Sequence, residues 1–227
     1  MKIVVKLPTR QRPAQCVKAL NLCIENQTTN NVHYLLTVDS DDRSMDKVIE
    51  VMHGHENITI DVGVSKSKID ACNRGLNEYT GEWDIVVLLS DDMICQQKGW
   101  DQQLIDEMSE HYPDTDGVLF HNDGYLGKVL NTMCILGRKY YDHFGYIYHP
   151  DYSSFWCDNE FQVVADKLKK QTYFETVLFK HEHPANNGGV ADSLYVENNT
   201  NFAKDKLTFD DRQSKKFPFI VHTYSNN

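Results

Sequence analysis

The feature that most constrains the fold is a run of aliphatic residues that ends in two carboxylates. Residues 85–89 read Ile-Val-Val-Leu-Leu, and Ser90, Asp91 and Asp92 follow without a break. A strand that is apolar on both faces is typical of the middle of a parallel sheet. Since ligands of open α/β sheets bind at the carboxyl ends of such strands, Asp91 and Asp92 are predicted to lie at a ligand-binding edge.

Two explanations of this carboxylate pair are open. Adjacent aspartates repel each other unless a cation or a set of N–H donors offsets their charge. A divalent metal that holds a phosphorylated substrate would provide that offset. Alternatively, one aspartate caps a following helix and the other is solvated.

The hydrophobic periodicity of the chain predicts alternating strands and helices. Strands are expected over residues 2–7, 33–38, 58–62 and 84–89, and helices from residue 13 and over residues 45–52, 67–79 and 100–112. The second half is less regular, with strands expected over 117–120, 132–136 and 172–181, helices over 138–144 and 158–168, and two polar helices from about residue 192. This alternation predicts a single α/β domain with a mostly parallel central sheet and helices on both faces.

Charge and composition restrict the partners and the compartment. The formal net charge of −10 disfavours bulk attraction to nucleic acid or anionic lipid. No apolar run approaches the ~20 residues that span a bilayer, so no transmembrane segment is expected. The first residues enter a strand-like run that is too short for a signal peptide, and the six cysteines form no Cys-x-x-Cys pair. We therefore expect a soluble, cytoplasmic protein.

Charged loops also follow the first two predicted strands. Residues 8–13 read Pro-Thr-Arg-Gln-Arg-Pro and lack the glycines of a dinucleotide-binding motif or a P-loop. Their two arginines either meet a diphosphate or are solvated in a proline-bounded turn. Residues 39–42 read Asp-Ser-Asp-Asp. A carboxylate there either accepts from a ribose hydroxyl or a base N–H, or forms a turn that caps the next helix.

Two later motifs complete the set of candidate site residues. His181 and His183 are two residues apart, so in an extended chain both imidazoles can face one site. Neutral imidazole is a good ligand for Mn²⁺-type ions alongside carboxylate and phosphate oxygens. Asp158 lies two residues after Trp156, at the start of a predicted helix. It is either the N-cap of that helix or a general base that takes a proton from an acceptor hydroxyl.

In this order and at this spacing, the motifs resemble the glycosyltransferase A-type (GT-A) fold, a Rossmann-like sandwich, and within it the large family-2-like group. The resemblance covers roughly residues 1–185. It implies that the opening loop and the next strand end hold the nucleotide and that a helix lines the donor sugar. The residues assigned to these roles are Pro8, Thr9, Arg10, Asp39, Asp41, Lys68 and Asn73.

The metal and base positions depart from the family pattern in two places. Ser90 stands where the family's Asp-x-Asp metal motif begins, so Asp92 is the expected direct ligand of Mn²⁺ or Mg²⁺, and Asp91 either supports Asp92 or contacts ribose and sugar. Cys157 replaces the glutamate of the family's Glu-Asp pair, while Asp158, the expected base, is retained. His181 or His183 matches the late histidine that often completes the metal site.

The resemblance implies a metal-dependent, inverting glycosyltransferase that moves a sugar from a nucleotide-sugar donor, with UDP favoured, to an acceptor hydroxyl. Residues 1–95 would form the nucleotide-sugar half, 96–190 the acceptor and catalytic half, and 191–227 a helical extension. His121, Asn122, Asp123 and Trp156 are assigned to the acceptor side. The acceptor is left open among a glycan, a lipid-linked sugar, a protein and a modified DNA base.

Two rival functions remain beside this one. A sugar nucleotidyltransferase also uses a parallel sheet and paired aspartates, although it normally has a glycine-rich loop after the first strand. A degenerate, non-catalytic carbohydrate-binding module would fit the replacements at Ser90 and Cys157.

Overall fold

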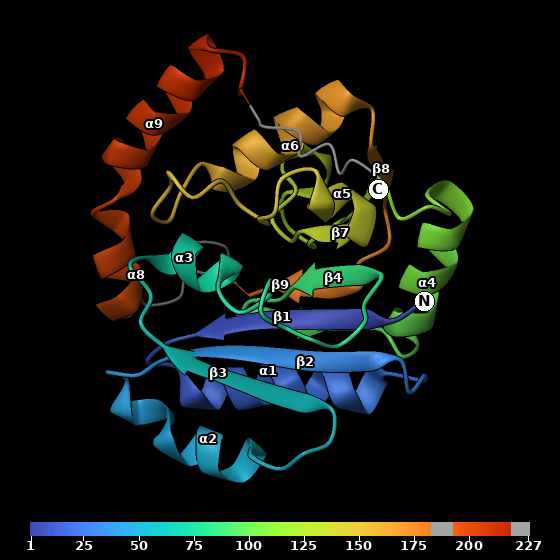
Figure 1. The fold of residues 1–227 in the computed structure, drawn as a ribbon, viewed down its shortest axis with the longest axis vertical. Coiled ribbons are helices and arrows are strands. Elements are labelled where there is room, and N and C mark those ends of the chain that lie inside the picture. Colours follow the sequence, from blue (N-terminus) through green and yellow to red (C-terminus); the bar gives the residue numbers. More distant parts are fainter. Residues whose placement is uncertain (183–192, 219–227) are drawn as a thin grey trace, which may run out of the picture.

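A twisted seven-stranded sheet forms the centre of the molecule (Figure 1). In the computed structural model, which describes residues 1–182 and 193–218, its strand order is β3-β2-β1-β4-β7-β6-β8. These strands are β1 (Ile3–Thr9), β2 (Val32–Asp39), β3 (Ile58–Gly63), β4 (Ile85–Leu88), β6 (Val118–His121), β7 (Ile135–Gly137) and β8 (Gln171–Phe174). Of these seven, β7 runs antiparallel to its neighbours and the other pairings are parallel. The predicted mostly parallel sheet is confirmed.

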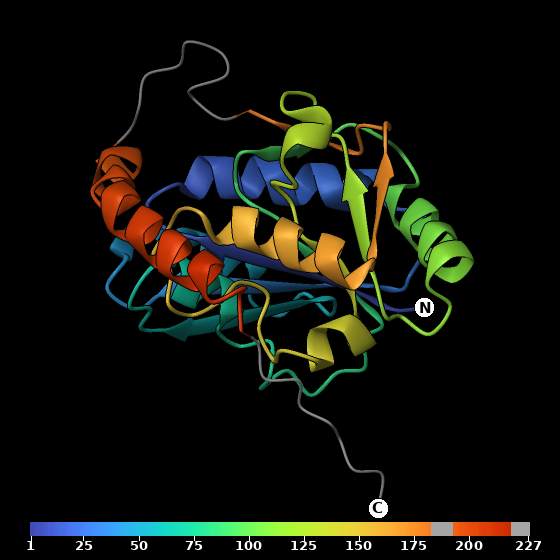
Figure 2. The same ribbon diagram turned by 90° about the horizontal axis from the view of Figure 1, so that it is seen from above.

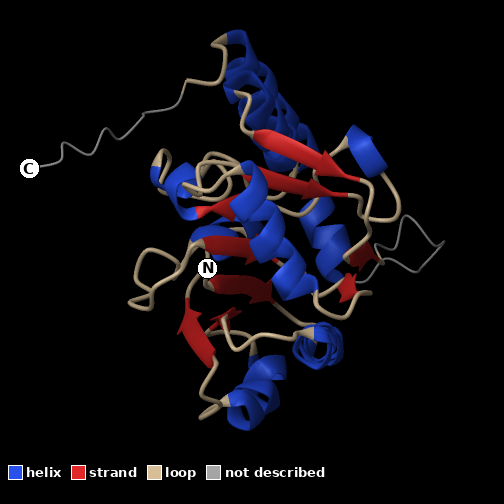
Figure 3. Ribbon diagram, turned by 90° about the vertical axis from the view of Figure 1, so that its right-hand side faces the viewer, coloured by secondary structure: helices blue, strands red, loops and turns tan. Residues whose placement is uncertain are grey.

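Helices cover both faces of this sheet (Figure 2), as Figure 3 also shows with the strands in red. Alternate residues of β1 point to the two faces: Ile3 and Val5 pack into one apolar cluster and Val4 into the other. The first cluster includes residues of α1 (Pro13–Asn26), α2 (Asp46–Met52) and α4 (Trp100–His111). The second includes residues of α3 (Lys68–Asn73), α5 (Arg138–Asp142), α6 (Cys157–Leu168) and α9 (Phe202–Ser214). The other helices in the described part of the chain are η1 (Arg43–Met45), η2 (Gly127–Val129) and α8 (Ser193–Asn199).

A second, two-stranded sheet pairs β5 (Met93–Cys95) with β9 (Phe179–His181) in antiparallel fashion. The single strand expected over residues 172–181 is therefore wrong, because its two ends form β8 and β9 in different sheets. The register places His181 opposite Met93. This short ladder brings the histidine to the carboxylates that follow β4.

The helix expected over residues 67–79 is also wrong in extent, since α3 ends at Asn73. Gly75 has φ +85°, which is the left-handed region that favours glycine. A Cβ at this position would lie 2.8 Å from Asp61 Oδ2. The chain therefore leaves the helix early to pass close to β3.

No helix in residues 1–182 and 193–218 has both the length and the apolar character to cross a membrane. The six cysteines are free thiols, and each is buried.

Lys6 is a buried amine in the central strand β1, where it donates to the hydroxyl of Thr37 on β2. Burial lowers its pKa from 10.5 to about 7. Between these two pKa values the unfolded chain binds more protons than the folded chain. The contribution of Lys6 to the free energy of unfolding is therefore lowest below pH 7 and rises with pH up to about 10.5.

Replacing this amine should change the pH dependence of stability. We expect Lys6→Met to raise the free energy of unfolding at pH 7, and this advantage over the wild type to shrink by about 2 kcal/mol between pH 7 and pH 9. Urea unfolding at both pH values measures it, with Lys47→Met, on the exposed side of α2, as the control. If the difference in unfolding free energy between Lys6→Met and the wild type does not change with pH, the folded chain does not hold Lys6 as a neutral amine.

Candidate functional site

Arg10 ties the loop after β1 to the loop after β2. Its guanidinium donates to Asp39 at 3.1 Å and to the two carboxylate oxygens of Asp41 at 2.5 and 3.0 Å. Asp42 forms the turn of this run, because its carboxylate accepts from the backbone N–H and the hydroxyl of Ser44. The capping role considered for this run thus belongs to Asp42, and Asp39 and Asp41 face the loop after β1.

Arg74 lies at the same edge, and the sequence patterns did not single it out. Its guanidinium is 3.6 Å from Asp39 Oδ1 and donates to the carbonyl oxygen of Val38 at 3.0 Å. Asp39 also accepts the backbone N–H of Ser65 at 3.1 Å. Asp39 is therefore held by two cations on either side, with a side-chain exposure of 13%.

Asp91 is buried behind the loop after β1. It accepts from Arg12 at 3.1 Å and from the Thr9 hydroxyl at 3.3 Å, while Pro8 lies partly exposed in β1. Burial raises the pKa of Asp91 to about 6, against the opposing effect of the Arg12 charge. Asp91 therefore fixes the position of the residues 9–12, and Arg12 is a second site residue that the sequence patterns did not separate from its loop.

Asp92 lies next to the second sheet, beside His181 of β9. One carboxylate oxygen accepts from the Ser90 hydroxyl and the other lies 3.6 Å from Nε2 of His181. The backbone N–H of Glu182 donates to the carbonyl oxygen of Asp92 at 2.7 Å, which continues the pairing of β5 with β9. Burial raises the pKa of Asp92, but His181 and Ser90 outweigh burial and hold this pKa below its ordinary value.

The other ring nitrogen of His181 faces Asp123, at 3.8 Å between Nδ1 and Oδ2. Asp123 is itself fixed, because it accepts the backbone N–H groups of Tyr125 and Leu126 and the hydroxyl of Thr132. Desolvation lowers the pKa of His181, but the two carboxylates outweigh it and raise this pKa to about 9. A carboxylate on one ring nitrogen is the usual partner of a metal-bound imidazole, since it orients the ring.

The donor set at this point fits a divalent metal. Asp92 Oδ2 and His181 Nε2 face each other, and a hard cation in a nucleotide site commonly takes one or two protein ligands and completes its shell with phosphates and water. No group of three His, Cys, Asp or Glu side chains in residues 1–182 and 193–218 is arranged to hold an ion by itself. His183 lies outside the described residues.

Asp158 lies at the same edge. The N-cap of α6 is Trp156, so the interpretation of Asp158 as the N-cap is wrong. Burial raises its pKa, while the Asn159 backbone N–H and the charges of Lys68 and His181 lower it. Its electrostatic partners thus include the histidine beside Asp92.

Lys68 lies near a carboxylate of each half of the chain, Asp92 of residues 1–95 and Asp158 of residues 96–190. It is solvent-accessible at the first position of α3, after Ser67, whose hydroxyl caps the helix. Desolvation lowers its pKa, but Cys72, Asp92 and Asp158 together raise it above its ordinary value. An accessible ammonium among these groups can meet a phosphate.

The other predicted site residues are engaged within the fold. The Asn73 amide bonds the backbone of residues 147–148, which attaches α3 to that loop. The His121 side chain is buried, 2.8 Å from Glu107 and stacked on Phe174. Asn122 accepts the backbone N–H of Gly124, at 2.8 Å.

The chain has no sequence match to a family model or to a curated protein. Solved structures do match its fold. The mannosyltransferase PcManGT from Pyrobaculum calidifontis, in complex with GDP-Man and Mn²⁺, superposes with a TM-score of 0.63 at 13% identity, over 82% of this chain and 58% of that one.

The protein TarS from S. aureus is similar to the same degree. Its residues 1–349 superpose with a TM-score of 0.63 at 15% identity, over 82% of this chain and 62% of that one. The complex of that fragment with UDP-GlcNAc gives a TM-score of 0.61 at 15% identity, over 87% and 64%. This chain thus spans less than two thirds of the length of these proteins, and it shares their fold.

Proposed function

We propose that this chain, which has the glycosyltransferase A-type fold, transfers a sugar from a nucleotide-sugar to an acceptor hydroxyl with the help of a divalent metal. The observation that carries the proposal is the meeting of Asp92 and His181, 3.6 Å apart, at the edge where Lys68 and Asp158 also lie. A metal-ligand pair, an accessible cation and a carboxylate of raised pKa are the groups that this reaction needs.

The nucleotide would lie across the ends of β1 and β2. Asp39 and Asp41 would accept from the base or the ribose, and Arg10 orients both carboxylates. The hydrogen bond from Thr9 to Asp91 holds this loop in place, and Lys68 would meet the diphosphate. UDP remains the favoured nucleotide, although the matched structures hold both UDP-GlcNAc and GDP-Man.

Asp92 and His181 would hold Mn²⁺ or Mg²⁺, with Asp123 orienting the imidazole through its other nitrogen. The metal, when bound, neutralises negative charge on the diphosphate leaving group. His183 stays a further candidate ligand outside the described residues.

Asp158 would act as the general base. The acceptor oxygen attacks the anomeric carbon from the face opposite the diphosphate, and Asp158 takes the hydroxyl proton as the new C–O bond forms. The old bond between the anomeric carbon and the diphosphate breaks, and its electron pair leaves with the nucleotide. The raised pKa of Asp158 suits this role because it makes the carboxylate a stronger base.

A thermal-shift screen tests donor binding. UDP-, GDP-, CMP- and dTDP-sugars are compared with and without Mn²⁺, because a ligand that binds the native state raises the apparent stability. At ~100 times its dissociation constant a donor adds about 2.7 kcal/mol, which is roughly 5–10 °C for a chain of this size. A shift that needs both sugar nucleotide and Mn²⁺ is the expected result.

The activity assay that follows separates the rivals. Metal-dependent release of the nucleotide from the best donor supports a transferase. Binding without release, with or without acceptors, would instead indicate a non-catalytic module. Pyrophosphate formed from a nucleoside triphosphate and a sugar 1-phosphate would indicate a nucleotidyltransferase.

A further inference from the structure

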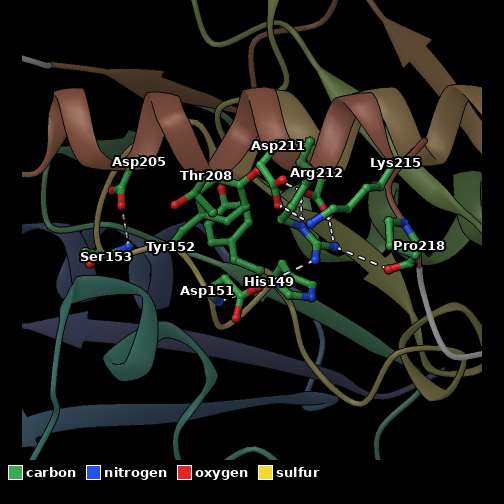
Figure 4. A network of polar contacts seen from close by, with 12 residues as sticks. His149, Asp151, Tyr152, Ser153, Asp205, Thr208, Asp211, Arg212, Lys215 and Pro218 are labelled. Atoms are coloured by element: carbon green, nitrogen blue, oxygen red, sulfur yellow. Dashed lines mark hydrogen bonds and ion pairs between the residues drawn. The ribbon is translucent and has the colours of Figure 1, made fainter.

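Helix α9 lies along one flank of the molecule, beside α6 (Figure 1). It is polar in sequence, and its side chains reach the loop of residues 149–156 that leads into α6 (Figure 4). Because Asp158 is the second residue of α6, this loop determines where that carboxylate lies. The contacts between α9 and the loop are therefore relevant to the base.

Asp205 is the first anchor. It is fully buried, and its carboxylate accepts the backbone N–H groups of three successive residues, Ser153 at 3.0 Å, Ser154 at 2.7 Å and Phe155 at 2.8 Å. A charged acceptor makes stronger hydrogen bonds than a neutral one. The three N–H groups are thus held in one orientation by a single side chain that lies some fifty residues later in the chain.

Arg212 is the second anchor. Its guanidinium bonds both oxygens of Glu160 on α6, at 2.7 and 2.8 Å, in a buried bidentate pair. The hydroxyl of Tyr152 donates to Glu160 at 2.7 Å. Since Glu160 follows Asp158 by two positions, α9 holds the first turn of α6 as well as the loop before it.

Trp156 stands between the two anchors in a backbone conformation that a non-glycine residue rarely adopts, with φ 65°. Such a conformation is strained and persists only where the surroundings hold it. Its indole packs against Phe202 and Phe209 of α9, at centroid distances of 5.6 and 5.3 Å. Residues before, at and after this turn are therefore all held by the same helix.

We propose that α9 is a positioning element for the catalytic base, and that Asp205 and Arg212 place the Asp158 carboxylate for proton transfer. This inference depends on the proposed function. Most of the donor-binding residues lie on other elements, although the Ser153 carbonyl accepts the N–H of Ile69, next to Lys68, at 3.3 Å. α9 is therefore expected to affect the chemical step more than donor binding. Asp205 and Arg212 act through Asp158 and do not touch the substrate.

Steady-state kinetics with Asp205→Asn provides the first test. The amide cannot accept all three N–H groups with a full charge, so the loop shifts. A displacement of about 1 Å at a reacting group can cost ~100-fold, and we expect kcat to fall about 10–100-fold while KM for the donor stays within about twofold. Asp210→Asn is the matched control, because Asp210 is an exposed carboxylate on the same helix. Equal loss in both variants, or a rise in donor KM without a loss in kcat, would overturn the proposal.

A double-mutant cycle tests whether Asp205 acts through Asp158. In the Asp158→Asn background, Asp205→Asn should lower kcat by less than about twofold, because the group that it positions is already gone. Full additivity of the two losses would overturn the proposal. If Asp205→Asn does not fold, Arg212→Lys replaces it, since lysine keeps the charge but not the bidentate pair.

Hydrogen exchange provides a test that needs no transferase activity. In Asp205→Asn the amides of residues 153–162 should exchange at least about tenfold faster, while those of residues 9–14 and 33–39, at the nucleotide edge, keep their rates. Unchanged exchange in residues 153–162 would overturn the positioning role. If Asp205→Asn shows this faster exchange while the wild-type chain shows no transferase activity, the positioning of Asp158 stands and the proposed function is rejected.

Discussion

Asp158→Asn should abolish most turnover while the donor still binds. Loss of a general base costs ~10²–10⁴-fold in rate, which corresponds to about 3–5 kcal/mol in activation free energy. The amide has nearly the same shape as the carboxylate but cannot take the proton. We therefore expect kcat to fall by that factor, and the affinity for nucleotide-sugar and Mn²⁺ to stay near the wild-type value in calorimetry.

Asp166→Asn is the control for this variant. Asp166 is an exposed carboxylate at the other end of α6, so its loss tests a change of charge on the same helix. Transfer by Asp158→Asn at a rate near that of the wild type would contradict the assignment of the base. A loss of donor affinity equal to the loss of rate would place Asp158 in the donor site.

Asp92→Ala should remove metal-dependent donor binding. Mutation of a residue that is hydrogen-bonded to a metal ligand typically lowers metal affinity about 10–100-fold. Loss of a direct ligand should lower it at least as much. We expect the affinity for UDP or GDP in the presence of Mn²⁺ to fall by more than about 100-fold, toward the value without metal.

The same calorimetric titrations are made with Asp46→Ala, which removes an exposed carboxylate on α2. This control should bind as the wild type does. Unchanged Mn²⁺-dependent nucleotide affinity in Asp92→Ala would exclude Asp92 as the ligand and would direct the search to Asp91.

The parallel half of the sheet could be predicted from sequence because its information is local. The aliphatic runs at β1, β2 and β4 and the polar residues after them define both the strands and the edge at which they end. The four-residue run 39–42 shows the limit of local information. Asp39, Asp41 and Asp42 were equivalent by pattern, and the contacts with Arg10 and Ser44 distinguish them.

The family resemblance singled out His181 or His183, but the pairing that brings His181 beside Asp92 could not be predicted, because it joins two three-residue strands far apart in sequence. Strands this short carry almost no periodic signal. The same is true of α3, whose early end follows from Gly75 and from the approach of Asp61. The role of Asp205 was also out of reach, since an acidic residue on a polar helix is usually solvated and this one is buried against a distant loop.

The position of α9 late in the chain has a consequence for synthesis on the ribosome. Residues emerge in order, so β1 to β4 and their helices leave the exit tunnel long before Asp205 and Arg212. The loop that carries Asp158 receives its anchors only when α9 has been translated. Under the proposed positioning role, the base would reach its place only after α9 docks, later than the strands of the nucleotide edge form.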